Sequence, residues 1–479
     1  MIGANGALAL PTSGSLPPDL QGTLFRAGPA WPWGSEGAGR LGGGGGGDGG
    51  RAGGEAGDGG EGGEGGGEHA GALHAVEFRD GRAVSYVRQE SDASASVFWH
   101  AGSILALPES GIPLRYSRFL VPEEFTGGLT VRIASHVHRQ AAGGGRVLFG
   151  IDDGSADGGP VDEGDGIFLR LGEWDAAGAL LSAQAVELER ATWQHDIGVT
   201  ATHVVFVESP TVRLPAGHGG SPAVPFGWVP GAEGWIGVVP RGGDGSLVHA
   251  DAVRWIRLDP CLVTHVLGAF DEPDGAIVLY VCCYGVPEVG QPVDLSASVV
   301  GSAGVGLSGI GSTLGVLERW RIVGDQVART QVDERSVEYP RMDAFCEGAP
   351  FRYGYCLETA WSAGSPPRAA VVEDVESGPA DATPVGLLKF DLMRDEIASW
   401  NPGPGRTPSE PIFVRATDGH GDDEGWLLTV VDDVNRGASD IYVLDASALG
   451  RSRPEAVIHL PARLPVRSHG EWVPADRYR

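Results

Sequence analysis

The chain has 479 residues, with 78 glycines, 33 prolines and a formal net charge of −28. This charge argues against nucleic acid and anionic membrane surfaces as partners, because a polyanion repels such a chain and gains nothing from counterion release. A neutral or apolar ligand is compatible with it. The length alone suggests two or three domains, although large β architectures commonly exceed the usual size of one domain.

The cysteines and the first residues bear on the cellular compartment. The five cysteines are an odd number without a CxxC pair, which favours a reducing compartment over a disulfide framework or a structural zinc site. The first 20 residues lack a basic segment followed by a long apolar one, and no later run reaches the roughly 18 apolar residues of a spanning helix. We therefore expect a cytoplasmic protein, soluble or at most peripherally associated with a membrane; its oligomeric state stays open.

The first recognisable feature along the chain is a glycine-rich insert at 41–71 with scattered acidic residues, which we predict to be a disordered surface loop. Two strand-like runs follow in LHAVEFRDGRAVSYVRQ, joined by Asp80-Gly81, a strong hairpin signal. Further strand and turn units recur to the end of the chain, in RVLFGIDDG, HVVFVESP, WIGVVPRGGDG, DGAIVLYVCCYG, LERWRIVGDQVARTQV, GLLKFDL, GWLLTVVDD, SDIYVLDAS and AVIHLPARLP.

Many short strands separated by Gly and Asp turns over this length favour an all-β fold, and a β-propeller rather than a sandwich, because a sandwich with so many strands would exceed its usual size. No WD or kelch signature accompanies the strands, so the periodicity alone supports a propeller only weakly. We expect one propeller domain over residues 1–479. A second flexible insert, at 293–315, is expected to cover one face.

Four histidines lie at the edges of strand-like runs: His136, His195, His265 and His469. They are 59, 70 and 204 residues apart, which excludes a local metal motif on one helix. In a propeller, residues from different blades converge on the axis, where four imidazoles could meet one ion. The competing interpretation is four unrelated histidines at turns.

Seven strings, taken in this order, are similar to the carotenoid cleavage oxygenase family over nearly the whole chain: GTLFRAGPA, LHAVEFRDG, HDIGVT, CLVTHVLGAF, EYPRMDAFCEGAPFRYGY, SEPIFV and LPARLPVRSHGEWV. The resemblance implies a seven-bladed β-propeller with loops and short helices capping an axial non-haem Fe(II). The positions that match the iron ligands are His136, His195, His265 and His469. His138 is the rival of His136, which we prefer because it directly follows the small residue Ser135.

The resemblance also implies three glutamates that orient the liganding imidazoles through their second ring nitrogens, at the matching positions Glu109, Glu338 and Glu410. Asp196 is interpreted as a structural turn residue. The aromatic residues beside these motifs fit a substrate tunnel or an ordinary core equally well: Phe98, Trp99, Trp193, Phe226, Trp228 and Phe270.

Two departures from relatives concern the substrate. Ala95 stands where many relatives have a threonine over the open iron position, and Pro108 stands where stilbene-cleaving relatives tend to have a lysine. The only lysine of the chain is Lys389.

The preferred hypothesis is an Fe(II)-dependent dioxygenase that uses O₂ to cleave a conjugated C=C bond of an apolar polyene, a carotenoid or apocarotenoid, into aldehyde or ketone products, without a protein acid or base. The first alternative is cleavage of a stilbene or another phenylpropenoid at the same iron site, which the absence of lysine before Glu109 disfavours. The second alternative is a propeller that binds a ligand without catalysis and needs no iron.

Overall fold

The computed structural model describes residues 8–29, 71–90, 96–107, 110–124, 133–140, 144–152, 166–213, 226–229, 231–242, 246–247, 252–285, 315–359, 386–419, 421–464 and 469–478. The inserts predicted at 41–71 and 293–315 lie outside these residues, apart from Gly71 and Gly315 at their ends.

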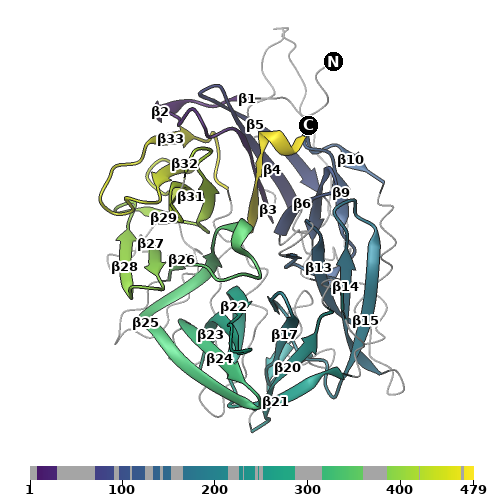
Figure 1. The fold of residues 1–479 in the computed structure, drawn as a ribbon. Helices are drawn as coiled ribbons and strands as arrows, with labels where there is room; N and C mark the ends of the chain where they lie inside the picture. The colour runs from purple at the N-terminus through teal and green to yellow at the C-terminus, as the bar shows by residue number, and fades with distance from the viewer. Residues whose placement is uncertain are drawn as a thin grey trace, which may run out of the picture.

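The described strands form seven antiparallel blades around a central axis, so the predicted seven-bladed β-propeller is confirmed (Figure 1). From the axis outward, the first blade contains β34 (Gly470–Pro474), β3 (Gly22–Pro29), β4 (Gly71–Arg79), β5 (Arg82–Glu90) and β1 (Leu8–Ala9). The second contains β6 (Ser96–His100), β7 (Ser103–Leu107), β9 (Leu114–Tyr116) and β10 (Pro122–Glu123). The third contains β12 (His138–Arg139), β13 (Arg146–Asp152), β14 (Ile167–Trp174) and β15 (Leu180–Leu188).

The fourth blade contains β16 (Gly198–Val199), β17 (His203–Glu208), β20 (Gly234–Pro240) and β21 (Arg254–Leu258). The fifth contains β22 (Leu262–Asp271), β23 (Ile277–Tyr284), β24 (Val316–Val323) and the first part of β25 (Gln326–Arg341). The last part of β25 begins the sixth blade, which continues with β26 (Tyr353–Glu358), β27 (Gly386–Asp391) and β28 (Glu396–Trp400). The seventh contains β29 (Arg406–Pro408), β30 (Ile412–Arg415), β31 (Gly425–Asp433), β32 (Ala438–Asp445), β33 (Ala456–His459) and β2 (Thr12–Gly14).

The long strand β25 joins two blades. It pairs with β24 up to Ser336 and with β26 from Val337 onward. Two small ribbons lie outside the blades: β8 (Ser110–Gly111) with β11 (Ile133–Ala134), and β18 (Thr211–Arg213) with β19 (Phe226–Trp228).

The two ends of the chain close the ring. Strand β34 near the C-terminus pairs with β3, placing Gly470 opposite Arg26, and the N-terminal strand β2 pairs with β33, placing Thr12 opposite Ile458. Each of these pairings joins segments from opposite ends of the sequence, so the first and seventh blades are completed only when both ends are in place.

The hydrophobic core lies between neighbouring blades, because each sheet presents one face to the blade on either side. Between the first and seventh blades, for example, Leu24 and Val76 belong to the same buried cluster as Val430 and Ile441. This packing holds the inner strands in place and leaves their ends to carry functional side chains near the axis.

The predicted hairpin at Asp80-Gly81 is confirmed. Strands β4 and β5 meet there, and both turn residues have positive φ, 51° for Asp80 and 71° for Gly81. Two consecutive residues in this region give the two-residue turn whose twist matches that of the strands, and Asp and Gly tolerate it best.

Helical structure is sparse. In the described part of the chain there is no α-helix, and the named helical elements are two 3₁₀ turns: η3 (Ala344–Cys346), which follows β25, and η4 (Ala475–Tyr478), which follows β34. No helix within the described residues is long and apolar enough to cross a membrane.

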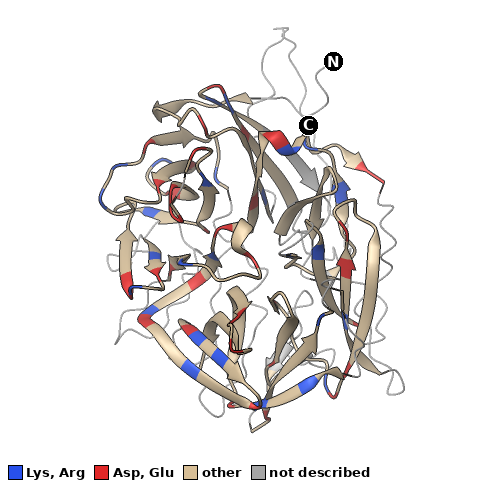
Figure 2. Ribbon diagram, in the orientation of Figure 1, with Lys and Arg blue, Asp and Glu red and all other residues tan. Residues whose placement is uncertain are grey.

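Acidic and basic residues are interspersed on the outer strands despite the large negative charge. Figure 2 shows both signs along β24 and β25. Arg319 and Arg321 of β24, for example, both pair with Glu272, at 2.8 and 2.6 Å. This part of the surface therefore presents no single-sign patch.

Candidate metal centre

The four histidines singled out in the sequence come from four different places near the axis. His136 lies in the bend between β11 and β12, His195 just before β16, His265 within β22, and His469 directly before β34. They belong to the third, fourth, fifth and first blades. A propeller brings them together because the inner strand of every blade borders the same axis.

The imidazoles converge through their Nε2 atoms. The Nε2 of His195 lies 3.2 Å from that of His136 and 3.3 Å from that of His265, and the Nε2 of His265 lies 3.3 Å from that of His469. One ligand atom from each of the four lies within 4.8 Å of the others. Nitrogens that bind one first-row ion at about 2.0–2.1 Å and at right angles are about 3 Å apart. This group could therefore hold a metal ion.

The surroundings of His469 and His136 favour the neutral imidazole, the form that binds a metal. Burial lowers the pKa of His469 to about 4, although Glu410 acts in the opposite direction. Burial, followed by the neighbouring imidazoles, lowers the pKa of His136 well below its ordinary value. Both rings thus offer a nitrogen lone pair at neutral pH.

Glu338 orients His265. It lies on β25 just after Val337, where this strand passes from the fifth blade to the sixth. Its Oε2 accepts a hydrogen bond from Nδ1 of His265 at 2.6 Å, and its Oε1 accepts one from the Thr264 hydroxyl at 2.8 Å and another, shorter one from the Tyr284 hydroxyl. Burial opposes ionisation of Glu338, but His265 and these hydroxyls lower the pKa of the carboxyl below its usual value. With Nδ1 donating, the lone pair of His265 is left on Nε2, toward the other histidines.

Glu410 orients His469 in the same way. Its Oε1 lies 2.8 Å from Nδ1 of His469, and its Oε2 accepts the backbone N–H of Gly470 at 2.9 Å. Arg341 donates to Oε1 at 2.7 Å, and Arg26 lies 3.9 Å from Oε2. Burial would raise the pKa of Glu410, but Arg341, His469 and Arg26 hold it well below its usual range.

The third predicted glutamate, Glu109, lies outside the described residues, as do Ala95 and Pro108. Thr264, Tyr284, Arg26 and Arg341 were not identified from the sequence. Of these four residues, only Thr264 is adjacent in sequence to a predicted metal ligand, His265. No local sequence pattern indicates the contact of Tyr284 with Glu338, which is 54 residues away.

His138, the rival of His136, does not join the four imidazoles. Its Nε2 lies 2.7 Å from Oδ1 of Asp196 and its Nδ1 lies 2.7 Å from Oε1 of Glu347. Burial alone would lower its pKa, but Asp196 and Glu347 raise it to about 10. His138 is therefore a cation beside the histidine cluster.

Two aromatic rings flank the imidazoles. Trp193 stacks on His195, with ring centroids 4.7 Å apart, and Tyr339 lies 5.4 Å from His265 and 5.1 Å from His469. Tyr339 has a φ of 51°, an uncommon conformation for a bulky residue, which turns its ring against the two histidines. Of the aromatic residues named from the sequence, Phe270 instead packs on Phe351, and Trp99 on Tyr478.

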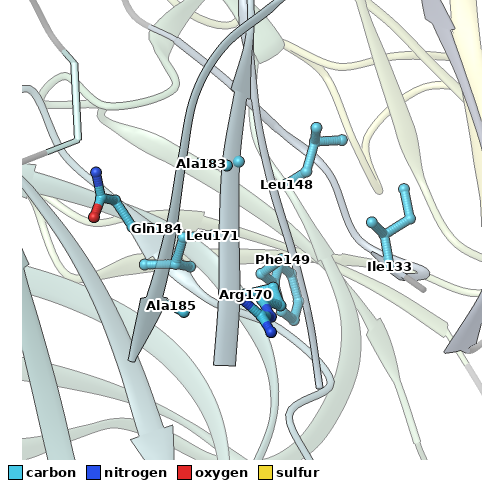
Figure 3. A pocket seen from close by; sticks show the side chains of 9 residues that line it. Ile133, Leu148, Phe149, Arg170, Leu171, Ala183, Gln184 and Ala185 are labelled. Atoms are coloured by element: carbon cyan, nitrogen blue, oxygen red, sulfur yellow. The ribbon is translucent and has the colours of Figure 1, made fainter. Parts of the chain in front are cut away.

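A separate hollow of about 240 Å³ lies on the third blade. Figure 3 shows its lining from β13, β14 and β15, including Leu148, Phe149 and Arg170, together with Ile133. None of the four clustered histidines lines it. It is therefore distinct from the candidate metal centre.

Comparison with known proteins identifies the family. Residues 64–474 match the family model described as retinal pigment epithelial membrane protein, RPE65. A carotenoid cleavage oxygenase of Mycobacterium tuberculosis is 28% identical over 263 residues, 54% of this chain and 46% of the relative. An isoeugenol monooxygenase of Pseudomonas nitroreducens is 24% identical over 396 residues, 80% of this chain and 75% of the relative.

The fold is shared with a solved structure, that of Pseudomonas brassicacearum lignostilbene dioxygenase, with a TM-score of 0.74 and 21% identity over 99% of this chain and 96% of the other. The chain spans about half the length of the carotenoid-cleaving relative it matches. The family match, in contrast, covers most of the chain and includes all four histidines. The chain therefore belongs to the retinal pigment epithelial membrane protein family, that of the carotenoid cleavage oxygenases.

Proposed function

We propose that this protein is an Fe(II)-dependent dioxygenase that cleaves a conjugated C=C bond of a carotenoid or apocarotenoid with O₂. Both oxygen atoms enter the products, so one alkene and one O₂ give two carbonyl compounds and no proton is taken up or released. The observation that carries the proposal is the convergence of four imidazoles, one ligand atom of each lying within 4.8 Å of the others.

His136, His195, His265 and His469 would hold the iron. Imidazole ligands suit Fe(II), and four neutral ones leave the charge of the ion unchanged and leave positions open on it. Iron(II) bound there would supply the one-electron chemistry that lets O₂ react with a closed-shell double bond.

The chain's own residues orient the ligands and exclude water. Glu338 and Glu410 hold the rings of His265 and His469 by their Nδ1 atoms, at 2.6 and 2.8 Å. Trp193 and Tyr339 cover the imidazole faces, which gives the centre an aromatic wall suited to an apolar substrate. Since the overall reaction transfers no proton, no side chain is needed as a general acid or base.

A phenylpropenoid substrate is the second candidate. It is favoured by the match to an isoeugenol monooxygenase over 75% of that protein's length. It is also favoured by Trp193, whose buried indole N–H makes no hydrogen bond within the described residues and could donate one to an oxygen-bearing substrate. The only lysine cannot bind a phenol at this site, since Lys389 pairs with Asp423 and the carbonyl of Ala446.

The test is anaerobic reconstitution with Fe(II), metal analysis, and product analysis after O₂ is admitted to a panel of carotenoids, apocarotenoids, stilbenes and isoeugenol. We expect about one iron per chain and two carbonyl products from a carotenoid or apocarotenoid. Products from isoeugenol or a stilbene alone would establish the second candidate. Absence of iron and of every product would leave the third hypothesis, a propeller that only binds.

The matched variants are His195→Ala and His459→Ala. His459 is a partly buried histidine on β33 that pairs with Asp440 at 2.9 Å, on the outer part of the seventh blade. We expect His195→Ala to lose iron and activity and His459→Ala to keep both. Full iron content in folded His195→Ala protein would contradict the metal assignment.

A further inference from the structure

The carboxylate of Asp196 accepts hydrogen bonds from three of the segments that carry the clustered histidines. Its Oδ1 accepts hydrogen bonds from Nε2 of His138 at 2.7 Å and from the backbone N–H of Ile197 at 2.8 Å. Its Oδ2 accepts the backbone N–H of Val266 at 2.7 Å. These donors belong to the third, fourth and fifth blades, and each lies within two residues of His136, His195 or His265.

His138 donates to this carboxylate as a cation. Both of its ring nitrogens lie 2.7 Å from carboxylate oxygens, those of Asp196 and Glu347. Ionised carboxylates only accept hydrogen bonds, so both nitrogens must donate and the ring carries both protons. Glu347 is fixed in turn, because its other oxygen accepts the backbone N–H of Arg139 at 2.8 Å.

Asp196 is itself well placed to act on the cluster. Its side chain is only 3% exposed, and its Oδ2 lies 4.0 Å from Nδ1 of His136. That distance is too long for a direct hydrogen bond. Asp196 therefore contacts the segments that carry His136, His195 and His265, through the His138 side chain and the backbone N–H groups of Ile197 and Val266, rather than the imidazole of His136 itself.

We propose that Asp196 is a positioning residue that, anchored by His138, sets the relative placement of the imidazoles of His136, His195 and His265. The inference rests on the proposed metal site, which these three histidines form with His469. It replaces the interpretation of Asp196 as an ordinary turn residue. A turn residue would only accept the N–H of Ile197, whereas two of the three donors to Asp196 come from other blades.

The decisive variant is Asp196→Asn. The amide keeps the shape but replaces one acceptor oxygen with an N–H donor, which must then face either His138 or the N–H of Val266. Metal-free protein is titrated with Co(II) against a chelator, and the visible absorption of the bound ion is recorded, because it reports the ligand geometry. We expect affinity to fall about 10- to 100-fold, as for other groups that orient metal ligands, with a changed absorption spectrum.

The matched control is Asp440→Asn. Asp440 is also a buried aspartate that accepts from a histidine, Nδ1 of His459 at 2.9 Å, but it lies on β32, toward the outside of the seventh blade. This variant tests the general effect of neutralising a buried Asp–His pair. We expect its Co(II) affinity and spectrum to equal those of the wild type, even where its thermal stability is lower.

His138→Gln decides the question where Asp196→Asn does not fold. It keeps Asp196 and all four clustered histidines but replaces the cationic anchor with a neutral donor, so we expect a smaller loss of about 3- to 10-fold and a shifted spectrum. Wild-type affinity and spectrum in the folded variants would overturn the positioning role alone. If the wild type binds no Co(II), or His195→Ala binds it equally well, the metal site itself is refuted, and this inference with it.

Discussion

The carboxylate of Glu338 lies 2.6 Å from Nδ1 of His265, and the two other side chains that donate to it are neutral hydroxyls, those of Thr264 and Tyr284. Glu410, which holds His469, instead lies between the guanidinium groups of Arg341 and Arg26. Each carboxylate thus contacts Nδ1 of its histidine, but the two carboxylates lie in different electrostatic surroundings.

This difference predicts unequal effects of neutralising them. Glu338→Gln should weaken metal binding about 10- to 100-fold with little loss of stability, because hydroxyl partners can reorient toward an amide. Glu410→Gln should weaken binding similarly and also destabilise the fold by about 3–5 kcal/mol, because it removes the charge of a buried carboxylate that pairs with Arg341 and Arg26. Metal titration and urea unfolding of the metal-free proteins separate the two effects. Wild-type metal binding in both variants would show that neither glutamate orients a ligand.

Tyr284→Phe should cost about 1.5–3 kcal/mol of unfolding free energy, since it removes a hydrogen bond to a charged, buried carboxylate. Metal stoichiometry should be unchanged, because His265 still donates to Glu338. Tyr355→Phe is the matched control, as the buried Tyr355 hydroxyl makes no hydrogen bond within the described residues. Equal unfolding free energies for the two variants would mean that the Tyr284 contact contributes nothing.

Deleting residues 42–67 should leave stability, metal binding and turnover nearly unchanged. Strands β3 and β4 are paired up to Pro29 and Gly71, so the remaining residues still connect two adjacent strand ends. Shortening the connection between two paired strand ends by this amount changes the closure free energy by less than about 1 kcal/mol. Thermal unfolding and product formation are compared with those of the full chain, and a large loss of activity would show that the insert takes part in function.

The metal-free protein should lose stability as the pH falls from about 6.5 to about 4. Burial lowers the pKa of His469 to about 4 and also lowers that of His136. In this window the unfolded chain takes up protons that the folded one does not, so lowering the pH favours unfolding. Urea unfolding at several pH values measures the slope, which should be shallower in His469→Gln. An identical slope in the variant would show that His469 does not titrate in this way.

Several features of the fold were readable from the sequence because they depend on neighbouring residues. Asp80-Gly81 predicted its hairpin from turn chemistry alone, and recurring short strands predicted an all-β fold. Predicting the number of blades and the metal-ligand role of the four histidines required the family resemblance. These histidines are 59, 70 and 204 residues apart, and no local sequence pattern indicates that they contact one another.

The family resemblance preferred His136 over His138, which is two residues away, and the tertiary structure shows where each of the two rings lies. A bend after β11 turns the first imidazole toward the axis, whereas the second meets carboxylates from the fourth blade and from the segment after η3. The roles of Asp196, Tyr284 and the arginines around Glu410 likewise arise between distant segments. Which side chains meet near the axis depends on how the seven blades are arranged around it. That arrangement is set by the packing of the whole ring rather than by any local sequence pattern.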